Sequence, residues 1–325
     1  MHRLAIATMP TTAERQVQSL RAAFTADAAS LGLHWLYDYP RLEALAADGH
    51  PLAFRAPDRA AYEGVSGYYA HENRTAGQLS HYGEGMVVLA ESLIATPGAF
   101  DTTVYLAHFE KFFGLGYDGY RDHATRETLV NLAAGTFPTG TSDDQVSATA
   151  KLPPLIIALL THPEMPHLAE QAASATNDHP LAREGARIVT AALGTALLGA
   201  TLADSLAAGL AESTSLRPAL TAALALDDVS PAVASQEFGP ACGLASALPL
   251  SFHLLLRAPS WEALIEGNIL AGGDSCGRAT FIGALYAAAH GLPEGMFAKL
   301  KDATALDLLI HQLVSLSSPQ VEREN

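Results

Sequence analysis

A glycine-rich turn followed at once by a helix of small residues is the part of the chain best suited to chemistry. Gly272 and Gly273 directly precede Asp274, which carries a carboxylate, and the segment from Ser275 onward is expected to be helical. The first N–H groups of a helix have no partner inside it, so they and the helix dipole face whatever Asp274 holds. Arg278 could offer its guanidinium to a phosphate or a carboxylate, or pair with Asp274. The structural alternative is that Asp274 or Ser275 only caps the helix.

A second candidate is the loop between residues 114 and 123, which concentrates aromatic and charged side chains between glycines. Tyr117 and Tyr120 could stack against a base, while Asp118 or Asp122 aims a carboxylate at ribose. His123 ends the loop. The alternative is a surface loop with an internal Arg–Asp pair and a helix cap from Asp122.

Cys276 and His81 are candidates for catalysis or metal binding only as a pair. A thiolate beside an imidazole is a nucleophile pair, and with Asp274 the two could hold a single soft divalent ion such as zinc. The alternative for Cys276 is a small buried apolar residue. Asp143 and Asp144 either cap a helix or supply an acid–base carboxylate or a ligand for calcium or magnesium. For Trp35, next to His34, packing competes with ligand binding.

Helices are expected to position these residues. Nearly half of the 325 residues are hydrophobic and only 7% are aromatic, and the abundant Ala and Leu favour helices over strands. Helical periodicity is predicted over residues 11–33, 84–94 and 102–113, and residues 51–77 are loop-like. No linker or fixed repeat divides the chain. We therefore expect one all-α domain over residues 1–325, with a core at about 12–312 and a tail at 313–325.

The charge excludes several function classes. The net charge of −15 and the absence of a basic cluster argue against DNA or RNA as a partner. Two uncharged stretches, residues 188–203 and 238–256, are better explained as buried helices than as membrane spans, so no membrane partner is expected. Two cysteines make no disulfide framework, which indicates a reducing cytoplasm.

Several segments, together spanning roughly residues 20–300, resemble the ADP-ribosylglycohydrolase family. The C-terminal third carries the most specific part of the match, because residues 244–249, 261–268 and 272–274 follow the family's order and its closing Gly-Gly-Asp. Residues 24–32 are similar to its opening Gly-Asp-Ala-Leu-Gly helix, and residues 77–84 lie where it has Gly-Gln-x-Thr-Asp-Asp-Thr. Lys151 lies where it has an arginine before Pro-Leu. The motifs at residues 33–38, 81–84 and 116–123 are similar to those of a side branch of the family that includes the J crystallins and selenoprotein J.

The resemblance implies a compact all-α fold with a pair of Mg²⁺ ions between two acidic turns. At the implied ligand positions this chain has one carboxylate among six residues, namely Ser80, His81, Tyr82, Asp274, Cys276 and Gly277. Mg²⁺ requires oxygen ligands in octahedral geometry, so a dinuclear site is not expected here. The family's catalytic glutamate also has no clear equivalent, since Trp35 or Leu36 falls at its position.

We therefore predict a hydrolase that cleaves an N- or O-glycosidic bond to ADP-ribose or a related ribosyl compound without the metal pair. The alternatives are a non-catalytic protein that binds ADP-ribose or a nucleotide and a crystallin-like structural protein. The candidate catalytic residues are Asp274, Asp118, Asp122, His81 and Cys276. No cofactor is expected, although one divalent ion could bind at Asp274, His81 and Cys276. The candidate ligand-binding residues are Trp35, Tyr82, Glu84, Tyr117, Tyr120, His123, Asp144, Lys151, Ser275 and Arg278.

Overall fold

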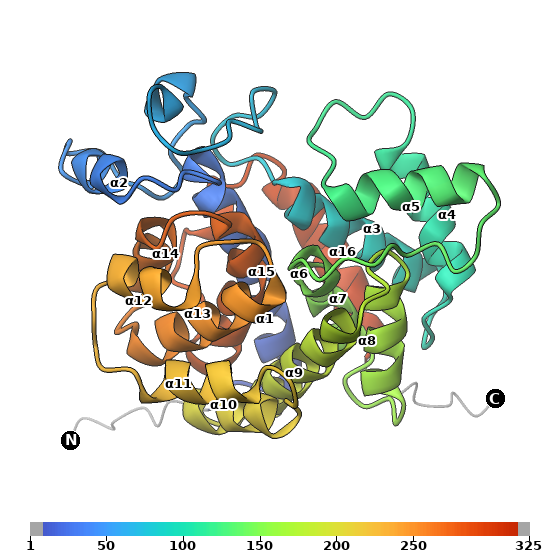
Figure 1. Cartoon of the computed structure of the whole chain (residues 1–325). Coiled ribbons are helices and arrows are strands. Elements are labelled where there is room, and N and C mark those ends of the chain that lie inside the picture. The colour runs from blue at the N-terminus through green and yellow to red at the C-terminus, as the bar shows by residue number, and fades with distance from the viewer. Residues whose placement is uncertain (1–8, 318–325) are drawn as a thin grey trace, which may run out of the picture.

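Two helices that are far apart in the sequence pack against each other and form the centre of the molecule. They are α1 (Thr12–Ser30) and α15 (Ser275–His290), seen in the computed structural model of the chain, which describes residues 9–317 (Figure 1). Almost every residue of α15 is buried, as expected for a helix that is apolar on all sides. Gly283 permits the close approach, because a Cβ there would lie 2.6 Å from Cβ of Ala26.

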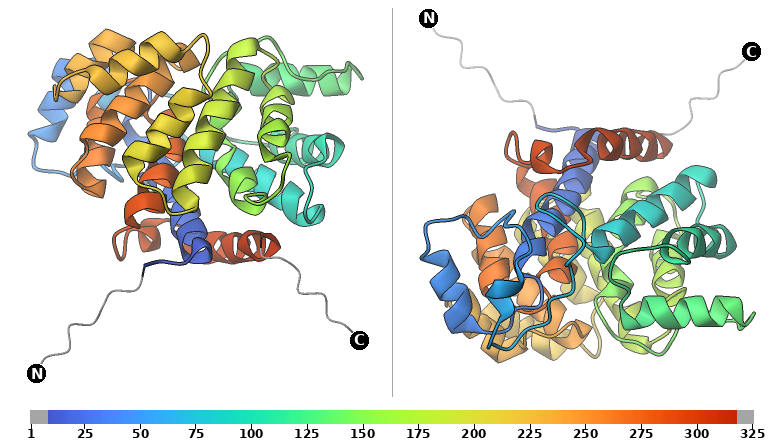
Figure 2. Two further views of the ribbon diagram at one scale, coloured as in Figure 1. Left: turned by 90° about the horizontal axis from the view of Figure 1, so that it is seen from below. Right: turned by 90° about the horizontal axis from the view of Figure 1, so that it is seen from above.

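The remaining helices surround this pair on both sides (Figure 2). On one side lie α9 to α14, and on the other lie α3 to α8, while α16 packs across α1, α3 and α7. Their bounds are α2 Tyr39–Ala46, α3 His81–Ala95, α4 Thr102–Phe113, α5 His123–Ala133, α6 Ser147–Ala150, α7 Pro153–Ala158, α8 Met165–Ser174, α9 Pro180–Leu197, α10 Leu202–Ala211, α11 Arg217–Ala225, α12 Pro231–Phe238, α13 Leu244–Arg257, α14 Trp261–Leu270 and α16 Ala303–Leu316, with 3-10 turns η1 Leu31–Leu33, η2 Arg59–Tyr62 and η3 Phe297–Lys299.

The prediction of a single all-α domain is confirmed. Within residues 9–317 the only extended pairings are isolated bridges, such as the one between Leu36 and Gly67. None of the helices in that range is long and apolar enough to cross a bilayer. Helix α16 runs four residues into the segment assigned to the tail, and Leu313 and Val314 are buried there. The rest of that tail, from residue 318, lies outside the described residues.

The segment between α1 and α3 folds over the end of the central pair. Trp35 donates its backbone N–H to Gly273 at 2.7 Å, and Phe54 donates to the carbonyl of Ala29 at 2.9 Å. These bonds anchor the long loop predicted at residues 51–77, whose only helical element is η2. The N-termini of α3 and α15 meet beneath this loop, and the candidate site lies there.

Candidate functional site

The turn before α15 requires glycine at two successive positions. Gly272 and Gly273 have φ values of 68° and 63°, in the left-handed region that side chains disfavour. A Cβ on Gly273 would also lie 2.0 Å from the carbonyl oxygen of Pro240. The turn therefore places Asp274 at the N-cap of α15, as the structural alternative from the sequence required.

Asp274 is fully buried and accepts hydrogen bonds at both carboxylate oxygens. The backbone N–H of Gly277 donates to Oδ1 at 3.0 Å, and the hydroxyl of Tyr82 donates to Oδ2 at 2.9 Å. Burial raises the pKa of Asp274 to about 6, although the charge of Arg278 and these two bonds oppose the rise. The carboxyl group is therefore partly protonated slightly below neutral pH.

The N-terminus of α3 is held by a second buried carboxylate, that of Asp27 on α1. Asp27 accepts the backbone N–H of Ser80 at 2.8 Å and also its hydroxyl. Burial raises the pKa of Asp27 to about 7. Gly83 is needed beside it, because a Cβ there would lie 2.3 Å from a carboxylate oxygen of Asp27. This arrangement fixes His81 and Tyr82 against α15.

Three buried histidines meet at the same point. The ring centroids of His34 and His71 are 5.2 Å apart. The ring centroid of His81 lies 6.2 Å from that of His34 and 6.0 Å from that of His71. Cys276 donates its backbone N–H to Nδ1 of His34 at 3.1 Å, so the ring proton of neutral His34 lies on Nε2. Burial lowers the pKa of all three histidines, to about 4 for His81.

These rings keep several nitrogen atoms without partners. Nε2 of His34, Nε2 of His71 and both ring nitrogens of His81 are buried and have no hydrogen-bond partner among residues 9–317. Buried polar groups are almost always hydrogen-bonded in proteins, with water counted as a partner. Such a concentration of unpartnered atoms is a feature of binding and catalytic sites.

An aromatic cover of Trp35, Tyr68 and Tyr120 closes this histidine cluster. The ring centroids of the cover lie 4.9 to 5.9 Å apart, and Tyr120 lies 5.3 Å from His81. Trp35 has a φ of 61°, a strained value for a residue with a bulky side chain. Tyr68 is the most exposed member, so a route to the cluster would pass this ring.

A small cavity lies beside His81, with a volume of about 30 Å³. Tyr82, His81, Asp122, Lys151 and Tyr105 are among the residues that line it. Burial opposes ionisation of Asp122, but the adjacent His81 and the hydrogen bond from Thr125 hold the pKa of Asp122 below its ordinary value. Burial lowers the pKa of Lys151 to about 7.

Five residues predicted for the site lie at its edge. Tyr117 donates its hydroxyl to Glu84, and Arg74 pairs with Glu84 at 2.8 Å and with Asp118 at 3.1 Å. The side chain of Asp118 is 73% exposed. His123 contacts a carboxylate oxygen of Asp143 at 2.7 Å and is half exposed. Asp144 is partly exposed, and its backbone carbonyl accepts from Leu244.

Three other predicted residues are used by the fold. Arg278 donates to the side chain and backbone oxygens of Asn268 and to the carbonyl of Gly272, at 2.7 to 3.0 Å. Ser275 donates to the carbonyl of Ser30 at 3.3 Å. The thiol of Cys276 faces the carbonyl oxygen of Asp27 at 3.6 Å, and burial raises its pKa well above the ordinary value. A thiolate nucleophile or zinc ligand is therefore disfavoured at Cys276.

The donor set does not fit a pair of Mg²⁺ ions. Ser80 caps α3, Tyr82 donates to Asp274, and burial raises the pKa of Tyr82 well above its ordinary value, so that its hydroxyl stays neutral. Among the residues that the structure describes, no three His, Cys, Asp or Glu side chains are arranged to bind a metal ion. One buried carboxylate at these positions cannot replace the oxygen ligands that magnesium requires.

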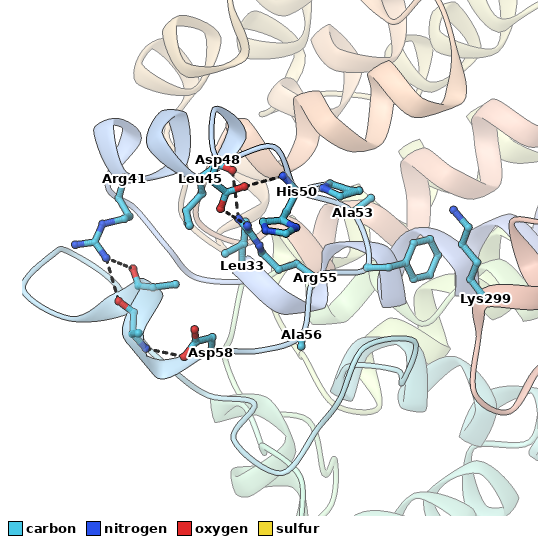
Figure 3. Close-up of a pocket in the computed structure, with 14 residues that line it drawn as sticks. Leu33, Arg41, Leu45, Asp48, His50, Ala53, Arg55, Ala56, Asp58 and Lys299 are labelled. Carbon is cyan, nitrogen blue, oxygen red and sulfur yellow. Dashed lines mark hydrogen bonds and ion pairs between the residues drawn. The ribbon is translucent and has the colours of Figure 1, made fainter.

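A larger cavity lies apart from this cluster and shares none of its histidines. It measures about 790 Å³ and is lined by α2, η2 and the loop between them (Figure 3). Its two guanidinium groups are already engaged, that of Arg41 by backbone carbonyls and that of Arg55 by Asp48. Its size alone therefore does not make it the reactive site.

Comparison with known proteins gives the family. The ADP-ribosylglycohydrolase family model matches residues 8–322, which is nearly the whole chain. The chain belongs to the ADP-ribosylglycohydrolase family. Crystallin J1A of Tripedalia cystophora is 23% identical over 295 residues, which cover 86% of this chain and 88% of the crystallin. A solved structure titled "ADP-ribosylglycohydrolase-related protein complex" superposes with a TM-score of 0.72 at 18% identity, over 95% of this chain and all of the other.

The family membership predicted from sequence is thus confirmed, as is the fold. Sequence reasoning missed His71, Asp27 and Tyr105 as parts of the site. His71 lies in a loop without periodicity, and Tyr105 follows the apolar spacing of α4, so neither gave a local signal. Asp27 stood out only as part of the family's opening motif.

Proposed function

We propose that this member of the family hydrolyses an N- or O-glycosidic bond to ADP-ribose or a related ribosyl compound without a magnesium pair. The observation that carries the proposal is a pair of buried carboxylates whose pKa values are displaced in opposite directions. That of Asp274 is raised to about 6, and that of Asp122 is lowered. Two carboxyl groups separated in this way suit an acid and a base at one centre.

The roles follow from the protonation states. Asp274 in its protonated form can donate to the leaving nitrogen or oxygen, and ionised Asp122 can stabilise the positive charge that develops on the ribosyl ring. Tyr82 contacts both the acid and His81, because its hydroxyl donates to Asp274 and its ring centroid lies 3.9 Å from that of His81. Tyr120 and Trp35 offer ring faces to a base or sugar once the aromatic cover opens.

The test is turnover in the presence of a chelator. Purified protein is incubated with ADP-ribosyl-arginine, ADP-ribosyl-serine and free nucleosides, with EDTA or with Mg²⁺. We expect equal turnover in both buffers and a loss of roughly 10²-fold or more in kcat for Asp274→Asn, as for removal of a general acid. Asp228→Asn is the control, since this carboxylate is exposed and outside the site. Absence of turnover, or turnover abolished by EDTA, contradicts the proposal.

A second candidate function is a structural, crystallin-like role or ligand binding without catalysis. It is favoured by the similarity to crystallin J1A and by the aromatic rings that cover the histidine cluster. Binding of ADP-ribose in calorimetry without product formation would identify a binding protein. An unchanged melting temperature across a panel of ribosyl ligands would identify a structural one.

A further inference from the structure

The cavity beside His81 is large enough for a water molecule. Its volume of about 30 Å³ exceeds the roughly 10–15 Å³ that one water needs. Residues of α3, of α4, of the start of α5 and of the segments around Lys151 and Asn177 line it. The polar residues on these walls, Tyr105, Asp122, His81 and Lys151, are between 0% and 6% exposed.

The polar atoms of this wall lack partners. Oδ2 of Asp122, the hydroxyl of Tyr105 and both ring nitrogens of His81 are buried without a hydrogen-bond partner among the described residues. Lys151 Nζ has one, the hydroxyl of Thr176, although an ammonium group has three protons to donate. Three independent side chains with unsatisfied groups around one cavity indicate an occupant.

The mixture of donors and acceptors identifies the occupant. A carboxylate oxygen only accepts, an ammonium group only donates, and a phenol or a neutral imidazole does both. A cation would face Lys151, and an anion would face Asp122. Water donates two hydrogen bonds and accepts two, so it satisfies both kinds of group.

We infer that this cavity holds one ordered water, and that this water is the nucleophile of the hydrolysis, held by Asp122, Tyr105 and His81. The inference rests on the proposed function. Tyr82 connects the cavity to the acid, because it lines the cavity and its hydroxyl donates to Asp274. Protein side chains thus hold the water that the resemblance assigns to metal ions elsewhere in the family.

The step balances without a cofactor. The water oxygen bonds to the anomeric carbon as one of its protons passes to Oδ2 of Asp122. The glycosidic bond breaks, its electron pair goes to the leaving nitrogen or oxygen, and that atom takes the proton of Asp274. Exchange with solvent then returns a proton to Asp274 and removes one from Asp122. Asp122 is a catalytic residue in this step, and Tyr105 is a positioning residue.

Gly85→Ala tests the inference because it fills the cavity without disturbing α3. Gly85 lines the cavity, and a Cβ there would meet only Cβ of Lys151, at 3.8 Å, an ordinary contact. Alanine also favours the helix over glycine. We expect a high-resolution crystal structure of the wild type to show one water bonded to Asp122 and Tyr105, and that of Gly85→Ala to lack it. The variant should keep its melting temperature and KM and lose about 10²-fold in kcat.

Two further variants complete the experiment. Gly194→Ala in α9 is the matched control, since its Cβ would lie 3.6 Å from Cε of Met165, and it should keep both the water and the kcat. Tyr105→Phe should lower kcat with KM unchanged and without loss of stability, because the hydroxyl it removes has no protein partner.

The outcomes separate this inference from the proposed function. A dry cavity in an active wild-type protein, or full kcat in Gly85→Ala, overturns the inference and leaves the hydrolase proposal standing. An occupied cavity in a protein that turns over no ribosyl substrate overturns the hydrolase proposal and the nucleophilic role of the water with it.

Discussion

Three buried carboxylates, those of Asp27, Asp122 and Asp274, differ in the hydrogen bonds that they accept and therefore in how easily they ionise. The carboxylate of Asp27 accepts from Ser80 at the start of α3, whereas that of Asp274 accepts from Tyr82 and Gly277. Asp122 has one oxygen bonded to Thr125 and the other on the cavity. Burial disfavours the charged form at all three, and local hydrogen bonds decide how much of that effect remains.

Asp27 gives a prediction for stability as a function of pH. Its pKa of about 7 in the folded protein exceeds the ordinary value of 3.8, so the folded state holds the proton more tightly than the unfolded state. The stabilisation is therefore complete below pH 4 and is lost as the pH rises through 7. Asparagine resembles the protonated acid and cannot ionise. We expect Asp27→Asn to match the wild type near pH 4 and to exceed its free energy of unfolding by about 4 kcal/mol at pH 8.

Urea denaturation of both proteins at several pH values measures this difference. Asp228→Asn, which removes an exposed carboxylate, should show no such trend. If Asp27→Asn is less stable than the wild type at pH 8, the folded protein holds Asp27 in its ionised form, and the argument from burial is wrong for this residue.

At the scale of elements, the turn between α14 and α15 depends on Arg278. Its three hydrogen bonds tie the end of α14 to the glycine turn that presents Asp274. One guanidinium nitrogen, Nη1, stays without a partner among the described residues. Burial lowers the pKa of Arg278 to about 10, so the group is still charged at neutral pH. The fork that the sequence suggested for an anionic ligand is thus used mainly to hold the turn.

Arg278→Lys separates these two roles. A single ammonium group cannot reproduce three fixed hydrogen bonds, and the buried oxygens of Asn268 and Gly272 would lose partners. We expect a loss of about 2–4 kcal/mol in the free energy of unfolding, measured by urea denaturation, and no effect of inorganic phosphate on either protein. Stabilisation of the wild type alone by phosphate would show that Arg278 binds anions.

The parts of the site that follow from local rules could be predicted from the sequence. A glycine pair before a helix of small residues gave Asp274, and a carboxylate before a helix gave Asp122 as a cap or as a site residue. The structure shows both residues as helix caps. His71 could not be predicted, because it reaches His34 and His81 only when the loop of residues 51–80 folds over two helix ends. The roles of Cys276 and Arg278 depend on which neighbours fill the interior, and spacing does not specify those neighbours.

At the scale of the molecule, the chain keeps the family's fold over nearly its whole length. The fold is set by apolar contacts spread over many helices, such as those between α1 and α15, and these tolerate substitution while volume and pattern are kept. A metal site depends on a few oxygen atoms at fixed positions. The start of α3 carries Ser80, His81 and Tyr82, and the start of α15 carries Cys276 and Gly277. These residues keep the two helix ends but do not supply the oxygen ligands of a magnesium pair.

The most direct test is a crystal of this protein soaked in Mn²⁺, which stands in for Mg²⁺ and is located by its anomalous scattering. The account predicts no pair of manganese peaks where the N-termini of α3 and α15 meet, because Asp274 is the only carboxylate left among the implied ligand positions. Two peaks there about 3.5–4 Å apart, the spacing of a two-metal site, would contradict it.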